Sequence, residues 1–192
     1  MKSLLTVLLL LSVAHLNAQN HDVFNANFGY VITHSDSING TISIDMESNT
    51  ILLRTGSVIE NYSAKQFSKV VFFDDDGVFK TIVSGYWGAD HQAYLFEELV
   101  SGDNPLLYRS GMKFNEFDAE KFPPYFTKQA ESIYSLGKKK DILNLFRNED
   151  AISDFVRKNK LKMKVKQDLI LLFSLANGVD SINAPSIAID EI

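Results

Sequence analysis

The chain of 192 residues contains no cysteine. This absence excludes disulfide bonds, thiolate metal sites, thiol nucleophiles and a lipid-modified N-terminal cysteine. The sequence also contains no G-x-S-x-G, P-loop, G-x-G-x-x-G or H-E-x-x-H motif, so it lacks the signatures of several hydrolase, nucleotide-binding and zinc-protease classes. Stability must therefore come from an apolar core, which agrees with the 14 phenylalanines and 7 tyrosines.

Long hydrophobic runs are also scarce, and the one near the N-terminus has the form of a secretory signal. Lys2 precedes an almost continuous apolar run over residues 4–13. Such a run suits the central region of a signal peptide and is too short for a membrane-spanning helix, which needs about 20 residues. We expect a signal peptide over residues 1–18, cut after Ala18, and export to the periplasm, the cell surface or the medium. The alternative is a buried N-terminal helix.

No later segment reaches membrane-spanning length. The most apolar one, residues 165–176, is too short and carries Lys166 and Asp168. We therefore expect no transmembrane helix in the mature chain, residues 19–192.

Positive charge is scarce in most of the mature chain and concentrated in one segment. Residues 19–137 carry 8 basic and 16 acidic side chains, whereas residues 138–166 carry 10 basic and 4 acidic ones. A protein that is acidic overall is a poor ligand for nucleic acid, so we predict no nucleic-acid partner. The basic segment is a candidate interaction surface.

Residues 28–113 have the pattern of successive antiparallel strands. The β-branched and aromatic residues at 29–33 precede Asn39-Gly40, a dipeptide typical of hairpin turns. Residues 41–46 alternate strictly between apolar and polar, which predicts a half-buried strand. Apolar runs flank the Asp-Gly at residues 76–77, a second hairpin signal.

The densest apolar stretch, residues 94–111, contains one turn signal at residues 101–105. This arrangement predicts two strands folded on each other. Just before it, residues 85–91, which contain Gly85 and Gly88, are predicted to form a loop or an irregular edge.

The strand and turn signals recur roughly every ten residues, which predicts an antiparallel sheet that closes as a sandwich or a partial barrel. After the prolines at 123–124, apolar residues recur with helical spacing in three segments: 141–146, 150–156 and 168–176. We therefore predict an α+β protein. Its parts are an antiparallel β domain over residues 19–113, a helical C-terminal region over 114–178 and a mobile tail over 179–192.

Lysine alternates with apolar residues near the end of the basic segment. A period of two predicts an extended segment with one basic face. This face is a candidate contact with an anionic surface, and the alternative is a solvated strand edge that lysines protect against unwanted pairing. The lysines concerned are Lys158, Lys160, Lys162, Lys164 and Lys166.

Four features occur together: a leader ending in Asn17-Ala18-Gln19, a first strand at 29–32 with an Asn-Gly hairpin, the segment 95–102 running into Leu107-Tyr108, and a lysine-rich helical tail. In these features the chain resembles a group of exported, uncharacterised β-rich proteins of the Bacteroidota. The resemblance implies an envelope location in a Gram-negative cell. It implies no established activity and no catalytic residues.

Tyr86 and Trp87 are the best candidates for contact with a ligand. Gly85 and Gly88 flank them, and exposed aromatic rings stack on sugars or on partner side chains. Burial of Trp87 over the sheet edge is the alternative. We add His91, in the same predicted loop, to the candidate ligand-binding residues.

The charged residues give little sign of catalysis. The aspartates at 74–76 lack the ligand spacing of a calcium loop and are interpreted as a hairpin tip. No two histidines have the spacing of metal ligands, so we predict no metal and no cofactor. Glu97 and Glu98 are expected to point to opposite faces of one strand and cannot act as a pair.

We expect a non-enzymatic binding or structural module whose partner is an envelope protein or a glycan. The alternative is a periplasmic hydrolase with a dispersed active site, for which Asp90, His91 and Glu98 are the candidate residues. A large exposed apolar patch would favour a structural or assembly role.

Overall fold

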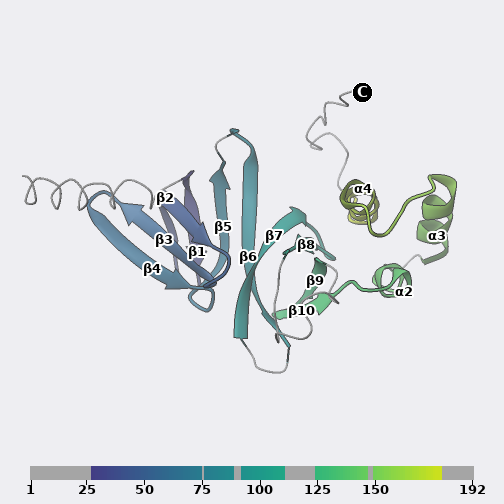
Figure 1. Ribbon diagram of the computed structural model, residues 1–192, viewed down its shortest axis with the longest axis horizontal. Coiled ribbons are helices and arrows are strands. Elements are labelled where there is room, and N and C mark those ends of the chain that lie inside the picture. The colour runs from purple at the N-terminus through teal and green to yellow at the C-terminus, as the bar shows by residue number, and fades with distance from the viewer. Residues whose placement is uncertain (1–26, 75, 89–91, 111–123, 147–148, 179–192) are drawn as a thin grey trace, which may run out of the picture.

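The computed structural model describes residues 27–74, 76–88, 92–110, 124–146 and 149–178, and these form a 10-stranded sheet followed by helices (Figure 1). The predicted α+β class is confirmed, and the sheet closes in part as a barrel. The predicted signal peptide and C-terminal tail lie outside the described residues.

The ten strands follow one another closely along the chain. They are β1 (Asn27–Thr33), β2 (Ser37–Asp45), β3 (Thr50–Thr55), β4 (Val58–Ser63), β5 (Phe67–Phe73), β6 (Phe79–Trp87), β7 (Gln92–Val100), β8 (Leu106–Tyr108), β9 (Tyr125–Gln129) and β10 (Ser132–Ser135). Their order in the sheet is β10-β9-β8-β7-β6-β5-β1-β2-β3-β4. A parallel bridge between Ser132 and Tyr86 joins β10 back to β6, so strands β6–β10 close on themselves.

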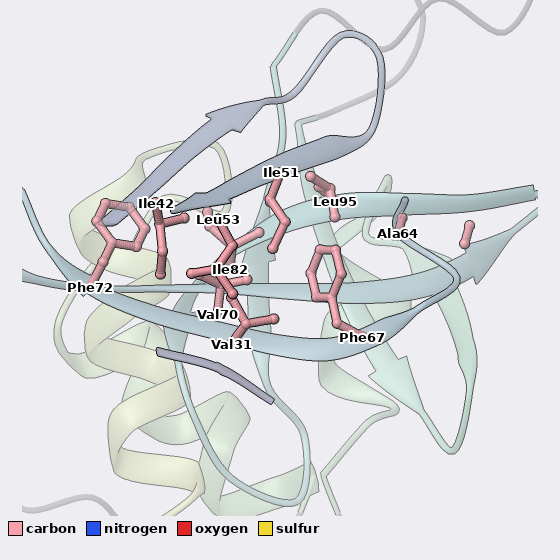
Figure 2. Close-up of a cluster of buried hydrophobic side chains, with 11 residues drawn as sticks. Val31, Ile42, Ile51, Leu53, Ala64, Phe67, Val70, Phe72, Ile82 and Leu95 are labelled. Atoms are coloured by element: carbon pink, nitrogen blue, oxygen red, sulfur yellow. The ribbon is translucent and has the colours of Figure 1, made fainter. Parts of the chain in front are cut away.

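The first core lies where β2 and β3 fold over β1, β5, β6 and β7 (Figure 2). Ile42 and Leu53 meet Val70 there, and all three are almost completely buried. The predicted alternation of residues 41–46 is confirmed, because Ile44 and Met46 pack against the same core. Each fully buried side chain of this size contributes about 1.5–3 kcal/mol of hydrophobic stabilisation.

The second core fills the closed part of the sheet, on the opposite face of β6 and β7. It consists of Val83, Phe96, Leu107, Phe126 and Ile133. The rings of Phe96 and Phe126 meet edge to face, with centroids 5.1 Å apart. Adjacent residues of β6 and β7 thus serve different cores, as the two-residue period of a strand requires.

The loop predicted at residues 85–91 is corrected at its start, because β6 continues to Trp87. Gly85 is a buried strand residue: a Cβ there would lie 2.6 Å from the Ile133 side chain. The glycine therefore makes room for Ile133 in the second core. Asp90 and His91 lie outside the described residues.

The hairpin predicted at Asn39-Gly40 is also corrected, because both residues lie within β2. The chain turns earlier, where the Thr33 backbone N–H donates to the Asp36 carbonyl oxygen at 2.8 Å. Gly40 pairs with Gly29, and a Cβ on Gly40 would lie 2.5 Å from the Arg54 carbonyl oxygen. The glycine signal thus reflects close approach of strands rather than a turn.

The predicted pair of strands in residues 94–111 is confirmed as β7 and β8. The region 114–178, predicted to be helical, begins differently from the prediction, because β9 and β10 extend the sheet through residues 125–135. The aromatic and β-branched residues of the run Tyr125-Phe126-Thr127 favour a strand. The two prolines therefore precede a strand and not a helix.

The helices predicted from apolar spacing are confirmed as α2 (Lys139–Leu143), α3 (Glu149–Lys158) and α4 (Lys166–Ala176). Their apolar sides form a third core with Leu106 and Tyr125 of the sheet. Gly178 has a φ of 68°, as expected for a glycine that ends a helix. None of the helices in the described ranges has the length and apolar character needed to cross a bilayer.

The extended segment predicted at residues 158–166 is wrong. Lys158 ends α3, Lys166 begins α4, and the residues between them form turns. The backbone N–H of Lys162 donates to the Asp168 carboxylate at 2.7 Å, which folds this connection against α4. Leu161 and Met163 pack on the third core, so the alternation arises from a folded loop with one apolar side.

Candidate functional site: a cleft between sheet and helices

A cleft of about 660 Å³ lies between the sheet and the helices. Its volume is within the range of sites that hold small ligands, about 300–1,000 Å³. Three parts of the chain that are distant in sequence contribute to it: the β7–β8 loop, the β9–β10 hairpin and the helical region. The lining residues are Asp103, Asn104, Lys128, Gln129, Ala130, Leu145, Phe146, Ile152, Ala176 and Asn177.

Two asparagines hold one wall of the cleft. The Asn177 side chain, at the end of α4, donates to the Asn104 carbonyl oxygen at 2.9 Å and accepts from the Asn104 backbone N–H at 3.2 Å. Gly102 has a φ of 139°, and a Cβ there would lie 2.5 Å from the Asn177 side chain. The glycine therefore allows the end of α4 to dock against the β7–β8 loop.

The β9–β10 hairpin lies next to the β7–β8 loop in the sheet and lines the cleft with a turn that holds a strained residue. Ala130 has a φ of 52°, in the left-handed region that is unfavourable for residues with a Cβ. Strained backbone of this kind occurs frequently at binding sites, where the surrounding structure imposes it. In this hairpin, the turn places Gln129 and Ala130 at the cleft.

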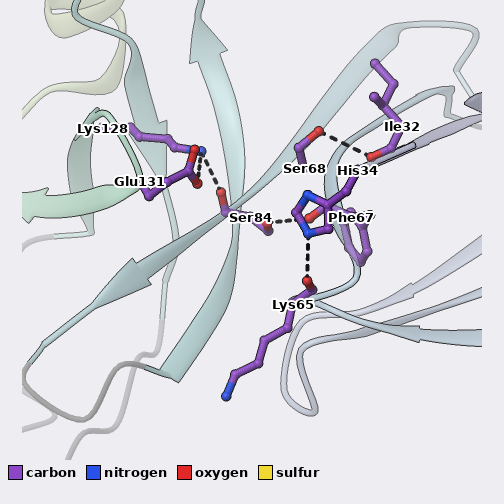
Figure 3. Close-up of polar contacts among 8 residues, drawn as sticks. All are labelled: Ile32, His34, Lys65, Phe67, Ser68, Ser84, Lys128 and Glu131. Atoms are coloured by element: carbon purple, nitrogen blue, oxygen red, sulfur yellow. Dashed lines mark hydrogen bonds and ion pairs between the residues drawn. The ribbon is translucent and has the colours of Figure 1, made fainter. Parts of the chain in front are cut away.

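Lys128 is the basic group of the cleft lining, and Figure 3 shows its ammonium group between Ser84 and Glu131. It donates to the Ser84 carbonyl oxygen at 3.0 Å and lies 3.5 Å from the Glu131 carboxylate. These two contacts engage two of its three N–H donors. Lys128 pairs with Ile133 across the hairpin, so its side chain lies on the face that carries the second core. Only 20% of the side chain is exposed, which strengthens a hydrogen bond made there.

The position of Lys128 is fixed by the strands behind it. The Ser84 hydroxyl donates to the Phe67 carbonyl oxygen at 2.6 Å (Figure 3). The Tyr86 backbone N–H donates to the Glu131 carbonyl oxygen at 3.0 Å. These bonds connect the β9–β10 hairpin to β6 and then to β5. The polar wall of the cleft is therefore built on the sheet.

The remaining lining is apolar and comes from the helical region. Phe146 is 7% exposed, and its ring meets Phe173 edge to face with centroids 5.2 Å apart. Ile152 is also buried, while Leu145 is half-buried. The cleft thus combines a carboxylate and side-chain amides with an apolar surface, an arrangement suited to binding a polar ligand that has apolar faces.

The predicted aromatic pair does not form a joint platform. Tyr86 and Trp87 are neighbours in β6 and therefore point to opposite faces of the sheet. Trp87 is half-buried and meets Tyr94 and Phe126 edge to face, with centroids 6.5 and 6.2 Å away. Packing against the sheet, the alternative weighed for Trp87, is thus what the geometry shows, and neither ring is among the described residues of the cleft lining.

The two glutamates considered for catalysis have different partners. Glu97 lies 3.8 Å from the Lys166 ammonium group of α4, and Glu98 lies 2.9 Å from that of Lys69 in β5. This separation agrees with the expectation that they cannot act as a pair. Asp90 and His91 lie outside the described residues, so the hydrolase alternative stays a prediction. Within the described part of the chain, His, Asp and Glu residues do not gather in a group of three that could hold a metal ion.

Arg109 is a polar anchor that sequence patterns did not indicate. It is 9% exposed and donates to the Asn49 side-chain oxygen at 2.6 Å and to the Leu95 carbonyl oxygen at 2.8 Å. A third bond goes to the Met46 carbonyl oxygen, and burial lowers the pKa of the guanidinium. Arg109 therefore ties the β2–β3 turn to β7.

Asp74 and Asp76 lie at the tip of the β5–β6 hairpin, as interpreted. The Asp74 carboxylate accepts the backbone N–H groups of Asp76 and Val78 at 3.1 and 2.8 Å and lies 3.1 Å from the Lys80 ammonium group. The Val78 bond is the main cause that lowers the pKa of Asp74.

Comparisons with known proteins leave the site to be interpreted from its geometry, since no protein-family model, curated protein or solved structure matches the chain.

Proposed function

We propose that the chain is an exported, non-enzymatic binding module of the cell envelope, and that the cleft between sheet and helices holds a short glycan. The cleft itself carries this proposal. Sugars present hydroxyl groups in the plane of the ring and apolar C–H groups on its faces. The cleft offers partners for both, namely the exposed polar side chains of Asp103 and Gln129 and the half-buried side chain of Leu145.

The signal-like N-terminus and the resemblance to exported Bacteroidota proteins support an envelope location. An envelope location in turn supports a glycan as the ligand, because bacterial envelopes contain glycans. The cleft volume of about 660 Å³ also suits a ligand of a few sugar rings better than a polymer surface.

The test is a binding assay with residues 19–192 and a panel of soluble envelope oligosaccharides, including peptidoglycan fragments. Trp87 is the single tryptophan, and its neighbour Tyr86 is bonded to the β9–β10 turn. The fluorescence emission of Trp87 therefore reports changes at the part of the cleft that this turn lines. We expect saturable binding with a shift in emission. Failure of every oligosaccharide to bind would overturn the glycan proposal.

Two exposed lining residues allow the site to be tested without disturbing the core. Asp103→Asn combined with Gln129→Ala should weaken glycan binding by about tenfold, equivalent to about 1.4 kcal/mol. The matched control is Asp76→Asn combined with Gln167→Ala, since both residues are exposed and do not line the cleft. Equal binding by the two double variants would place the ligand elsewhere.

A further inference from the structure

Three phenylalanines form an exposed apolar patch on the face of the sheet opposite the first core. Phe28, Phe73 and Phe79 are 68%, 47% and 56% exposed. They come from the adjacent strands β1, β5 and β6: Phe73 pairs with Phe79, and Phe28 is next to Gly29, which pairs with Phe72. Contiguous exposed apolar patches of this kind are often functional contact sites.

The patch combines a projecting ring with a hollow beside it. The hollow has a volume of about 80 Å³ and is lined by Phe28, Gly29, Tyr30, Asn39, Val71, Phe72, Phe73 and Phe79. Phe28 is the most exposed ring of the three and stands at its edge. A surface that carries both a knob and a hole can pair with a copy of itself across a two-fold axis.

The charges around the patch permit this pairing. The side chains that line the hollow are uncharged, and Asp74 and Lys80, next to Phe73 and Phe79 in the sequence, pair with each other at 3.1 Å. Two copies of an acidic protein can therefore meet at this hollow without placing like charges in it. This is the reason to choose a second copy over a charged partner.

The area also fits a second copy. Aromatic side chains bury about 150–250 Å² each, so three rings that are about half exposed offer roughly 300–400 Å² of apolar surface per copy. A stable interface buries about 800 Å² per partner, with an apolar centre and a polar rim. The rings supply that centre, and Asn39 and Thr41 on the neighbouring strand β2 supply part of the rim.

We propose that this patch is the contact surface of a homodimer, in which Phe28 of each copy enters the hollow of the other. The contact lies on strands β1, β5 and β6, away from the described residues of the cleft lining. The test of the homodimer therefore does not decide the glycan proposal, and the test of the glycan proposal does not decide the homodimer.

Sedimentation velocity of residues 19–192 over a range of concentrations tests the homodimer. We expect a monomer–dimer equilibrium whose dissociation constant rises about tenfold or more in Phe28→Ser and in Phe79→Ser. Ile59→Ser is the matched control, because Ile59 is 49% exposed on β4 and does not line the hollow. A monomer at every concentration, or equal effects of all three substitutions, would overturn the proposal.

The absence of cysteine allows a second, independent measurement. A cysteine introduced as Asn39→Cys should be joined to its counterpart by a short bismaleimide linker, and addition of Phe28→Ser should abolish the product. Lys139→Cys, on exposed α2, should give no linked dimer. Linkage at Lys139→Cys but not at Asn39→Cys would place the contact on another surface and overturn the assignment.

Discussion

At the scale of single residues, buried polar groups fix the geometry of this protein more than its motifs do. Arg109 and Asn49, which are buried, and Asn177, which is half-buried, each bond to backbone far away in the sequence. The desolvation of such groups is offset only while every bond is made. Their substitution should therefore have larger effects than that of similar residues on the surface.

Replacing Arg109 by lysine should destabilise the fold by at least about 2 kcal/mol, because one ammonium group cannot reproduce the planar set of three bonds. Urea unfolding followed by circular dichroism measures the change. Arg157→Lys is the control: that side chain is exposed and should alter stability by no more than about 0.5 kcal/mol. Equal effects of the two substitutions would contradict the role assigned to Arg109.

Asp74 should make stability depend on acid pH. Its pKa is lower in the folded chain than in the unfolded chain, so its contribution is present above the ordinary carboxyl pKa. That contribution is lost as pH falls below about 4, through the folded pKa. In Asp74→Asn the amide oxygen keeps the turn bonds without titrating, so the fall in urea midpoint between pH 6 and pH 3 should be smaller than in the wild type.

Lys80→Gln separates the two main contacts of the Asp74 carboxylate. This substitution removes the ion pair and keeps the bond from the Val78 N–H, the largest cause of the pKa shift. We expect a fall in urea midpoint between those of the wild type and Asp74→Asn. A fall in Asp74→Asn as large as in the wild type would contradict the account.

At the scale of elements, the contact between α4 and the β7–β8 loop shapes the cleft. Asn177→Ala removes two hydrogen bonds and should destabilise the chain by about 1–2 kcal/mol. In this variant, amide hydrogen exchange in α4 should become faster than in the wild type, while exchange in β5 should stay the same. Asn159→Ala is matched in chemistry, since Asn159 bonds only within its own helix end at Phe155, and should leave α4 exchange unchanged.

The sequence pattern predicted a strand or helix correctly where only one face of that element is buried. The run at 41–46 and the helical spacing in α2 and α3 specify one apolar side, and that side is the one the structure buries. The lysine alternation failed because a folded loop with one apolar side gives the same period as a strand. Gly40 and Gly85 were misread because their signal depends on neighbours from other strands.

At the scale of the whole molecule, one sheet serves two cores on opposite faces and carries the helices at its closed end. The cleft could not be predicted, since it depends on contacts such as Asn104 to Asn177, 73 residues apart. Asn177-Gly178 was visible in the sequence only as a helix stop. Lys128 had no sequence signal at all, because its partners Ser84 and Glu131 meet only when β10 reaches β6.

We propose above all that the cleft is the binding site. Two-dimensional amide NMR of residues 19–192, with the best-binding envelope oligosaccharide titrated in, tests this location most directly. The account predicts shifts concentrated at residues 102–104, 128–131 and 174–178, with the amides of β1 and β4 unchanged. Shifts concentrated on β1, β5 and β6, or no saturable shift, would contradict it.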